Sequence, residues 1–569
     1  IRLTAATLGT TDTRLNYEQP TVTGTAVTSF ITSTTGNQNL KFVVSAANKT
    51  TKGVVTNVAN LTNLISSTGV VDVLSDAPIN VVSVESSVSS VKLASALPIL
   101  DGNSTFGPDI VAKTGVELNS TVGGIGEMGA GLELVVSPGG TISGSASGSI
   151  WLNQMGDNFE VGTITSTTGR VKLYANKSIL DTTADTAADI SAVSVDLTAL
   201  TGSVGSSGKR LDIDSSRNGG VGLVTVSAAT DVYMEETTGN IYVASIVAST
   251  GTVQLVSQGG ILDGAKTVFT KISGNGISLV ASAGAIGETS NDLEIDLQGT
   301  SRLTATASTN VFVTEKLGAL RITNVTGTTG AVRLTVAETS GLGDDLTLEF
   351  GNSIVAGTTA AIMAGDDINL MSGSSITAGN GSVTLTGDKP SLDPEGTTVT
   401  INGTINATAT VSIVGNSQGA TLVSAMDASY LLTTKLLART PASVGSNAEI
   451  FSLTGFMAAS LTGGAGDNTF DIGAWTGTTL TAIIDGGAGR DTVTATTDTD
   501  FTAVNALLKR VGSGDATLLN IENGVFRGGA KANKFNMSGW TLSGTVDGGA
   551  GAKIIDTIIS NVAGSTMLA

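Results

Sequence analysis

The segment GGILDGAKTVFTKISGNGISLVASAGAIGETSNDLEIDL, residues 259–297, determines the fold that we expect for this chain. Its last five residues, 293–297, alternate aliphatic and acidic side chains, so an extended strand here would have one aliphatic and one charged face. Short aliphatic runs such as 277–280 lie between turns that contain glycine. The segment therefore indicates several short β-strands joined by tight turns.

The same pattern occurs two more times upstream, at a spacing of about 80 residues. Four features keep this spacing: an Ile-Leu-Asp motif, a turn glycine, an apolar–acidic–apolar triplet, and a Val-x-Leu triplet that recurs once more downstream. These features begin at Ile99, Ile179 and Ile261; at Gly126, Gly205 and Gly287; at Leu132, Leu211 and Leu293; and at Val91, Val171, Val253 and Val332. A period shared by four features identifies a repeat protein.

Each repeat contains too many strands for one coil of a solenoid. Coils of about 20 residues would give about four coils per repeat and roughly 28 coils in the chain. Glycine accounts for 73 of the 569 residues, aromatic residues for 4% and charged residues for 14%, so the interior must be filled by Val, Ile, Leu and Ala. We predict an all-β protein, a parallel β-helix or β-solenoid whose strands pair coil on coil.

The repeats divide the chain into four predicted regions. A degenerate solenoid start covers residues 1–80, the clear repeats cover 81–388, a proline-containing joint covers 389–396, and a second solenoid region with GGAG turns covers 397–569. The two prolines of the joint cannot donate to a strand ladder. Neither end of the chain resembles a polar cap that would close a solenoid, so we expect a segment of a longer protein.

Two segments of the last region are predicted to be short helices that decorate the solenoid. Residues 425–439 place three leucines on one side of a helix. Residues 500–511 begin with an Asp that could cap a helix and then group four apolar side chains on one face. We expect both helices to pack on the side or the end of the coils.

The charge and the missing residue types exclude several classes of function. The net charge is −19 without a basic cluster, which argues against nucleic acid and anionic lipid as partners and is compatible with loosely bound divalent cations. No apolar run reaches the roughly 18 residues of a membrane-spanning helix, so we expect no membrane insertion. The chain contains no cysteine and no histidine. Thiol and histidine chemistry is therefore excluded, and we expect no enzyme.

Two adjacent acidic pairs, Asp344-Asp345 and Asp366-Asp367, do not change that expectation. Neighbouring residues on one strand point to opposite faces, so neither pair forms a ready-made general acid and base. We interpret them as solvated turn residues. Trp475 and Trp540 occupy the same position in two copies of a second, 65-residue repeat, which favours packing over a sugar-binding platform.

The GGAG turns of the last region could hold calcium. Residues 486–493 resemble the nonapeptide GGxGxDxUx of RTX proteins, in which an Asp and backbone carbonyls bind calcium between successive turns. The resemblance implies Asp485, Asp491 and Asp467 as calcium ligands. The copies lie 20 or more residues apart, whereas working sites stack consecutive nonapeptides. Glycine-rich corners without metal are therefore the favoured interpretation, and no other cofactor is expected.

Longer stretches resemble a family of bacterial surface proteins. Residues 232–264 and 283–297 are similar to the repeats of filamentous-haemagglutinin-type adhesins, which are very large secreted proteins. The stretch from Ile521 onward resembles the degenerate RTX-like modules found in the same proteins. This resemblance implies a right-handed β-solenoid that lies outside the cell, at the cell surface, and takes part in adhesion, aggregation or the building of a biofilm matrix.

These observations lead to three hypotheses about function. The first is an extracellular structural or adhesive segment of a large surface or matrix protein, whose partner is a surface glycan or a neighbouring cell-surface protein. The second is a subunit that associates with itself end to end into a filament or sheath, because an uncapped solenoid end exposes unpaired backbone groups. The third and most remote is a polysaccharide-cleaving β-helix, which would require a groove lined by converging carboxylates and basic residues.

Overall fold

The computed structural model describes residues 15–19, 27–29, 40–46, 59–62, 64–66 and 69–560, apart from 104–106, 184, 220, 341–342, 390–395, 416–418, 444–446 and 550–556. The described residues belong to two compact units, unit 1 (Ile1–Ser301) and unit 2 (Arg302–Ala569). Of the predicted proline joint at 389–396, all but the first and last residues lie outside the described part.

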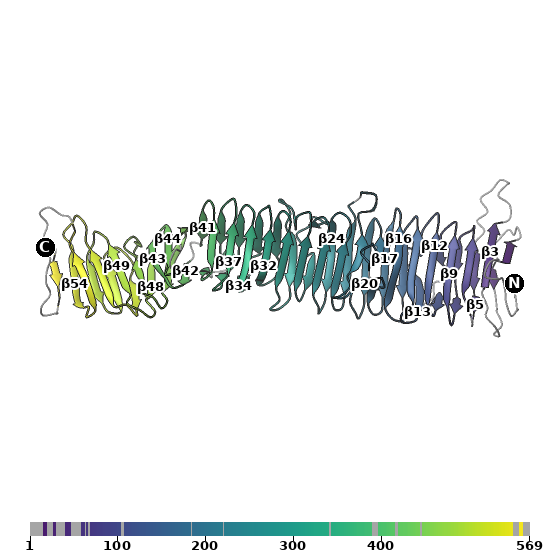
Figure 1. Ribbon diagram of the computed structural model, residues 1–569, viewed down its shortest axis with the longest axis horizontal. Coiled ribbons are helices and arrows are strands. Elements are labelled where there is room, and N and C mark those ends of the chain that lie inside the picture. The colour runs from purple at the N-terminus through teal and green to yellow at the C-terminus, as the bar shows by residue number, and fades with distance from the viewer. Residues whose placement is uncertain are drawn as a thin grey trace. The chain divides into compact units, whose positions relative to one another are not determined.

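Each unit is a parallel β-solenoid, which confirms the predicted fold class (Figure 1). Strands of successive coils pair in parallel, and each coil contributes strands to two sheets, here called sheet A and sheet B. The described residues form about 20 coils, fewer than the roughly 28 expected for the chain. The difference arises because coils are often longer than 20 residues: Val71 pairs with Val91, but Val332 pairs with Ala360.

The strands of unit 1 alternate between the two sheets along the chain. Sheet A contains β1 (Leu15–Gln19), β3 (Leu40–Ala46), β6 (Val71–Ser75), β9 (Ser90–Ser95), β12 (Gly115–Ser120), β14 (Thr141–Ala146), β16 (Phe159–Ser166), β18 (Ile179–Asp181), β19 (Ile190–Ser191), β21 (Leu211–Asp214), β23 (Val232–Glu236), β25 (Val253–Ser257) and β28 (Ile277–Ala281). Sheet B contains β2 (Val27–Ser29), β4 (Ala59–Thr62), β5 (Leu64–Ser66), β7 (Ile79–Val81), β8 (Val84–Ser86), β10 (Ile99–Asp101), β11 (Ile110–Ala112), β13 (Leu132–Val136), β15 (Ile150–Gln154), β17 (Arg170–Ala175), β20 (Ser194–Ala199), β22 (Leu223–Ala228), β24 (Ile241–Ala248), β26 (Ile261–Asp263), β27 (Ile272–Gly274) and β29 (Leu293–Leu297).

Unit 2 has the same two-sheet arrangement. Sheet A contains β30 (Leu303–Ala307), β32 (Leu320–Gly327), β34 (Leu346–Ala356), β36 (Ile368–Leu370), β37 (Ser375–Ala378), β39 (Thr398–Ile401), β40 (Thr404–Ala407), β42 (Ala420–Ala425), β46 (Phe456–Thr462), β48 (Thr481–Asp485), β50 (Phe501–Val504), β51 (Leu507–Arg510), β52 (Ala516–Leu519), β54 (Lys534–Gly539) and β56 (Thr557–Ile559). Sheet B contains β31 (Val311–Glu315), β33 (Val332–Val336), β35 (Ala360–Met363), β38 (Val383–Thr386), β41 (Val411–Val414), β43 (Ala428–Thr433), β44 (Leu436–Pro441), β45 (Glu449–Thr454), β47 (Thr469–Asp471), β49 (Thr492–Thr496), β53 (Asn523–Arg527) and β55 (Ser543–Asp547).

The interior of the coils is aliphatic, as the composition predicts. Strand β13 alternates buried and half-buried residues, so every second side chain points inward. The inward side chains stack in register along the sheets: Val73 pairs with Leu93, and Leu93 with Leu118, all three without exposed surface. Each such Val, Leu or Ile contributes about 1.5–3 kcal/mol when it is fully buried. These stacks stabilise the coils without disulfides, since the chain has no cysteine.

The 80-residue repeat corresponds to about three and a half turns of the solenoid, not to four. The Ile-Leu-Asp motif forms β10 in sheet B, then β18 in sheet A, then β26 in sheet B. An odd number of half-turns therefore separates successive repeats. With coils of about 23 residues, such as the one between Asp189 and Asp212, 80 residues make roughly three and a half turns. Equivalent loops of successive repeats consequently emerge on alternate sides of unit 1.

The recurring turn glycine is required by its backbone conformation. Gly126, Gly205 and Gly287 have φ values of 67°, 68° and 71°, in the left-handed region that side chains disfavour. At Gly205 a Cβ atom would also lie 2.1 Å from the carbonyl oxygen of Tyr233 in the next coil. The glycine thus permits both the turn and the close approach of the neighbouring backbone.

Replacing Gly205 by alanine should lower the free energy of unfolding of unit 1 by about 1–3 kcal/mol, because the left-handed conformation and the overlap with Tyr233 both cost energy. Urea unfolding followed by the fluorescence of Trp151 would measure this. Gly208→Ala is the matched control in the same turn, since its Cβ would meet nothing within 4 Å. Equal losses in the two variants would contradict the explanation.

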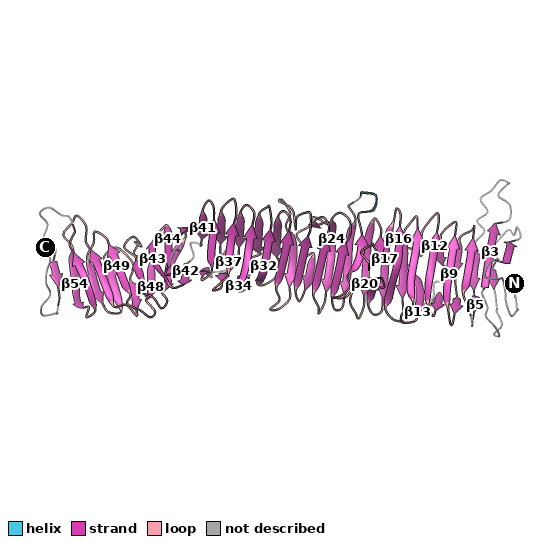
Figure 2. Ribbon diagram, viewed as in Figure 1, coloured by secondary structure: helices cyan, strands magenta, loops and turns pink. Residues whose placement is uncertain are grey.

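The two predicted helices are wrong. No α-helix occurs among the described residues, and only the 3-10 turn η1 (Arg217–Gly219) is helical (Figure 2). Residues 428–441 instead form the antiparallel hairpin β43–β44, and residues 501–510 form the hairpin β50–β51. Short runs of Leu and Ala fit a buried hairpin as well as a helix, and periodicity over so few residues does not separate the two.

Pairing with the coils decides this choice in favour of strands. β44 continues the hairpin by pairing antiparallel with β45, and β51 does the same with β52. β43 and β50 also pair in parallel with β47 and β54, so each hairpin is hydrogen-bonded to the coils. A helix at these places would leave the backbone groups of those neighbouring strands without partners.

Candidate functional site

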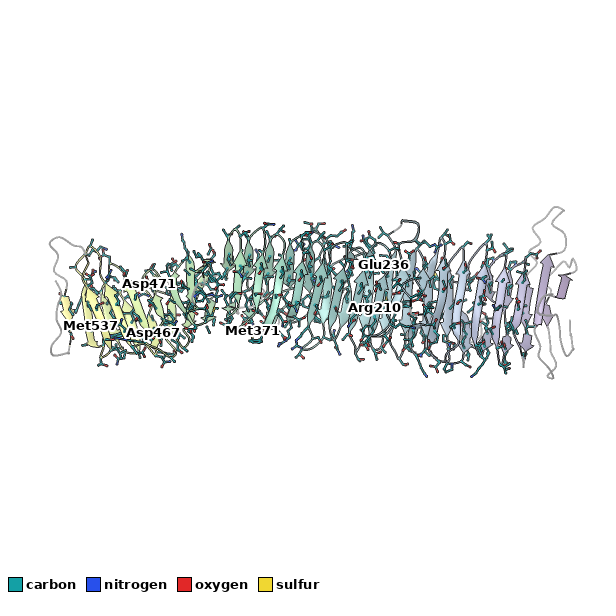
Figure 3. All side chains as sticks on the ribbon, viewed as in Figure 1. Arg210, Glu236, Met371, Asp467, Asp471 and Met537 are labelled. Atoms are coloured by element: carbon teal, nitrogen blue, oxygen red, sulfur yellow. The ribbon has the colours of Figure 1, made fainter. Side chains whose placement is uncertain are left out.

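The glycine turns that begin at Gly463 and Gly486 each follow a strand of sheet A, β46 or β48, so they lie on the same edge of the coils, near Asp467 in Figure 3. The amide of Asn468 donates to a carboxylate oxygen of Asp491 at 2.7 Å, and the amide of Asp491 donates to Glu522 at 2.8 Å. One coil before, the carboxylate of Asp427 accepts a hydrogen bond from the side-chain amide of Asn468 at 3.1 Å. Each acidic or amide side chain thus caps the turn of an adjacent coil.

The 20-residue spacing of the nonapeptide copies, which argued against stacking, is in fact the length of one coil. The copies that begin at Gly463 and Gly486 lie on successive coils, and the amide of Ala488 donates to the carbonyl of Gly464 at 2.8 Å. The sequence argument treated separation along the chain as separation in space, although turns one coil apart lie directly above one another. Two of the predicted calcium turns therefore do stack directly on one another.

The three predicted calcium residues do not come together. Asp467 accepts the backbone amide of Arg490 at 2.8 Å, while Asp485 accepts the side-chain amide of Asn520 at 2.7 Å. Asp491 is fully buried, and one of its carboxylate oxygens has no hydrogen-bond partner among the described residues. Burial, with nearby Glu522 and Asp467, raises the pKa of Asp491. The calcium assignment to these residues stays a prediction.

A tighter carboxylate cluster lies in unit 1, at residues that the sequence reasoning did not select. Asp101, at the end of β10, Asp109, just before β11, and Glu133 in β13 bring ligand oxygens within 4.8 Å of one another. Asp109 is fully buried and accepts the backbone amide of Glu133 at 2.9 Å and the side-chain amide of Asn103 at 3.1 Å. We call these three residues the repeat-1 triad.

The repeat-1 triad concentrates negative charge in a poorly solvated place. Burial, together with the charges of Asp101 and Glu133, raises the pKa of Asp109 to about 8. The hydrogen bond from the Glu133 amide acts in the opposite direction but does not compensate. Three oxygen ligands of this kind suit a hard cation such as Ca²⁺.

The equivalent acidic residues 80 positions further along the chain also lie near one another, although their ligand oxygens do not all come within 4.8 Å as those of the repeat-1 triad do. Asp181 in β18, Asp189 before β19 and Asp212 in β21 form the repeat-2 triad. Asp189 accepts the amide of Asp212 at 3.1 Å, and the hydroxyl of Thr183 donates to both Asp181 and Asp189, at 3.0 and 3.2 Å. Burial raises the pKa of Asp189 to about 7 and that of Asp212 to about 6, with neighbouring carboxylates adding to both shifts.

The Asp pairs of unit 2 are less exposed than the sequence interpretation suggests. Asp344 and Asp366 are buried, and their carboxylates accept backbone amides of Thr339 and Gly343, each at 2.6 Å. Their buried carboxylates thus close turns of the chain. Asp345 and Asp367 are only half-buried, so the two members of each pair differ in environment as strand neighbours should.

Another buried carboxylate, Glu236 at the end of β23 (labelled in Figure 3), has no exposed surface. It accepts the hydroxyl of Ser215 at 2.6 Å and the amide of Ser215 at 3.1 Å. Burial raises its pKa to about 8, and the charge of nearby Asp214 acts in the same direction. Gln154, at the end of β15, occupies the equivalent position one repeat earlier and is also buried.

Replacing Glu236 by glutamine should therefore stabilise unit 1 at pH 9 by about 1–3 kcal/mol, the usual cost of an inadequately compensated buried polar group. A carboxyl whose folded pKa lies above its unfolded pKa stabilises the fold below the unfolded value and loses that effect as pH rises through the folded value. The advantage of Glu236→Gln should hence grow between about pH 4.5 and pH 8. Thermal unfolding in the presence of a chelator would measure it, and an advantage independent of pH would contradict the assignment.

Two shallow grooves lie on the outside of the coils. One, of about 540 Å³ in unit 1, contains Glu117, whose carboxylate binds Lys92 at 2.8 Å and has a lowered pKa for that reason. The other, of about 750 Å³ in unit 2, contains Glu449, which binds Arg439 at 2.5 Å. In each groove the single carboxylate is already paired with a cation, so neither groove holds the pair of carboxylates used to cleave glycosidic bonds.

The three tryptophans are packed against other residues and are not exposed on the surface as a sugar-binding platform would be. Trp475 and Trp540 are buried, and their indole N–H groups donate to the carbonyls of Thr481 at 3.2 Å and Ser543 at 3.1 Å. Trp151 is half-buried beneath the ammonium group of Lys172, which lies 5.2 Å from the ring centre. Trp475 and Trp540 thus occupy equivalent packed positions, as their shared place in the repeat predicts.

None of the described helices is long and apolar enough to span a bilayer. Comparisons of the chain with protein-family models, with curated proteins and with solved structures found no match.

Proposed function

We propose that this chain is a non-catalytic structural or adhesive β-solenoid of a large extracellular bacterial surface or matrix protein. The observation that carries the proposal is the parallel coil-on-coil pairing of each unit around an aliphatic interior. Such a ladder satisfies its backbone hydrogen bonds between coils, and its stability grows with each added coil. The resemblance to filamentous-haemagglutinin-type repeats supports the extracellular placement.

The chemistry of the surface agrees with a scaffold role. Many outward side chains of the coils are small and polar, as in β30, where Thr304 and Thr306 lie on the outer face. The carboxylates of the two grooves are neutralised by Lys92 and Arg439. An acidic chain with a mainly aliphatic interior suits a protein whose function depends on extended, stable structure.

Beads coated with the purified chain test the proposal. They should attach to a cell or glycan surface more than beads coated with a Leu279→Asp variant, in which a charge replaces a side chain without exposed surface and disrupts the coils. The native chain should release no reducing sugar from polysaccharides. Equal attachment of the two preparations, or release of sugar, would contradict the proposal.

Sedimentation velocity separates the scaffold from the filament alternative. A scaffold segment should stay monomeric as its concentration rises from about 1 to 100 µM, because a net charge of −19 opposes association. A series of growing oligomers, with fibres in electron micrographs, would favour end-to-end assembly instead.

A further inference from the structure

The repeat-1 and repeat-2 triads have a third counterpart, in which a lysine replaces one of the three acidic residues. The Ile-Leu-Asp motif of the third repeat supplies Asp263, and Glu294 of β29 occupies the place of Glu133 and Asp212. The loop between the first two members has the same length in all three copies, residues 101–109, 181–189 and 263–271. At its last position, where the first two copies have Asp109 and Asp189, the third copy has Lys271.

The three copies also agree in backbone hydrogen bonding. The amide of Asp109 donates to the carbonyl of Glu133, that of Asp189 to Asp212, and that of Lys271 to Glu294, at 2.8, 2.8 and 2.9 Å. Each is followed directly by an isoleucine that begins a strand: β11, β19 or β27. The three residues are therefore equivalent in the fold, and only their side chains differ.

The ammonium group of Lys271 is buried and is surrounded by oxygen atoms. It lies 3.7 Å from a carboxylate oxygen of Asp263 and 3.8 Å from one of Glu294, and the side chain of Lys271 is 1% exposed. It also donates to the carbonyl and hydroxyl of Thr267, at 2.7 and 3.0 Å, and to the carbonyl of Phe269. The third copy thus encloses a positive charge among two carboxylates, two carbonyls and a hydroxyl.

From this internal comparison we propose that the repeat-1 and repeat-2 triads each bind a divalent cation, with Ca²⁺ as the ion that fits, and that Lys271 replaces the cation in the third repeat. In the first two copies a third carboxylate stands where the lysine would be, so a cation must be supplied from solution. In the third copy the side chain of Lys271 itself supplies the positive charge. The same loop therefore gives two ion sites and one internal ion pair.

The geometry of the repeat-1 triad suits calcium. Calcium binds oxygen ligands at about 2.3–2.6 Å, so two ligands of one ion lie at most about 5 Å apart. The ligand oxygens of Asp101, Asp109 and Glu133 satisfy that limit, because they all lie within 4.8 Å of one another.

The cation would join successive coils. Asp101 and Asp109 belong to one coil, and Glu133 belongs to the next, which pairs with the first through β11 and β13. The repeat-2 triad does the same on the other sheet, since β18, β19 and β21 belong to sheet A. The two ions would thus clamp coils on alternate sides of unit 1, a consequence of the three-and-a-half-turn repeat.

The third copy itself supplies the variants for the test. Asp109→Lys and Asp189→Lys copy the native residue of the third repeat, and Lys271→Asp copies that of the first two. In equilibrium dialysis of the full chain against Ca²⁺ after removal of metal with a chelator, each Lys variant should bind one Ca²⁺ fewer than the native chain, and the double variant two fewer. Lys271→Asp should bind one more.

Thermal unfolding adds a readout that does not depend on counting ions. The unfolding of unit 1 can be followed by the fluorescence of Trp151. Calcium should raise the unfolding temperature of the native chain, and should raise that of Asp109→Lys/Asp189→Lys by less. Without calcium, the double variant should unfold at a higher temperature than the native chain, because each lysine supplies the missing charge. Asp491→Asn serves as the control for ions held in the glycine turns of unit 2, and it should leave these differences unchanged.

Several outcomes would overturn the proposal. The proposal fails if the native chain binds no Ca²⁺ in the millimolar range, or if the native chain and the double variant bind the same number of ions. It also fails if Lys271→Asp, shown by circular dichroism to be folded, binds no additional ion. If the lysine variants fail to fold, Asp109→Asn/Asp189→Asn replaces them and should still bind fewer ions. Preference for Mg²⁺ over Ca²⁺ in the same titrations would overturn the choice of ion.

Discussion

Replacing Arg439 by alanine should lower the free energy of unfolding of unit 2 by about 3–5 kcal/mol, the usual loss when one partner of a buried ion pair is removed. Arg439, in β44, has a fully buried side chain that binds Glu449 at 2.5 Å, donates to the carbonyl of Ile401 at 2.6 Å, and also donates to the carbonyl of Gly403. The guanidinium group also lies 5.2 Å from the ring centre of Phe451.

The loss follows from what the alanine would leave behind. The carboxylate of Glu449 and the carbonyls of Ile401 and Gly403 would each lose a charged hydrogen-bond donor in a poorly solvated place. Urea unfolding followed by the fluorescence of Trp475 and Trp540, both in unit 2, would measure the change. Lys509→Ala is the control, because Lys509 pairs with Asp515 at 3.1 Å while about half of each side chain is exposed. It should cost less than about 1 kcal/mol.

An equal effect of Arg439→Ala and Lys509→Ala would mean that the buried arginine does not fasten the hairpin β43–β44 to the coils. The second hairpin, β50–β51, also contains a buried arginine that binds the coils. Arg510 of β51 donates to the carbonyls of Ile472 at 2.5 Å and Trp475 at 3.1 Å. Burial lowers the pKa of Arg510 to about 10, which still leaves it charged at neutral pH.

Replacing Phe501 by alanine should also destabilise unit 2 by about 3–5 kcal/mol, as is usual for a buried phenylalanine. Phe501 has 1% exposed surface, and its ring stacks on Phe535 with 5.1 Å between the ring centres. Phe526 lies 6.1 Å away and itself contacts the edge of Trp540 at 5.4 Å. The deletion would open a cavity in the middle of this aromatic cluster.

Phe350→Ala provides the matched control, because the same side chain is 73% exposed there. It should change the free energy of unfolding by no more than about 0.5 kcal/mol. The same urea titration serves both variants, and a shift in the emission of Trp540 would report the loss of its contact with Phe526. If Phe501→Ala cost no more than Phe350→Ala, the cluster would not stabilise the last coils.

The sequence by itself determined the solenoid and its interior. The alternation of aliphatic and polar residues in 293–297 and the shared period of Ile99, Ile179 and Ile261 are local signals, and parallel coil stacking is the arrangement that buries every such stretch. The positive φ of Gly205 was equally local, because only glycine adopts it without strain. These features depend on nearest neighbours in the chain, so they can be read from it.

The tertiary structure alone decided the features that depend on which residues meet across coils. Whether residues 428–441 form a helix or a hairpin was settled by strands β45 and β47, which lie beside them and offer hydrogen-bond partners. The meeting of Asp101, Asp109 and Glu133 depends on the length of one coil, which places residues 24 positions apart side by side. Sequence patterns fix which face of a strand is buried, but a carboxylate cluster forms only where the coil length sets the register between neighbouring strands.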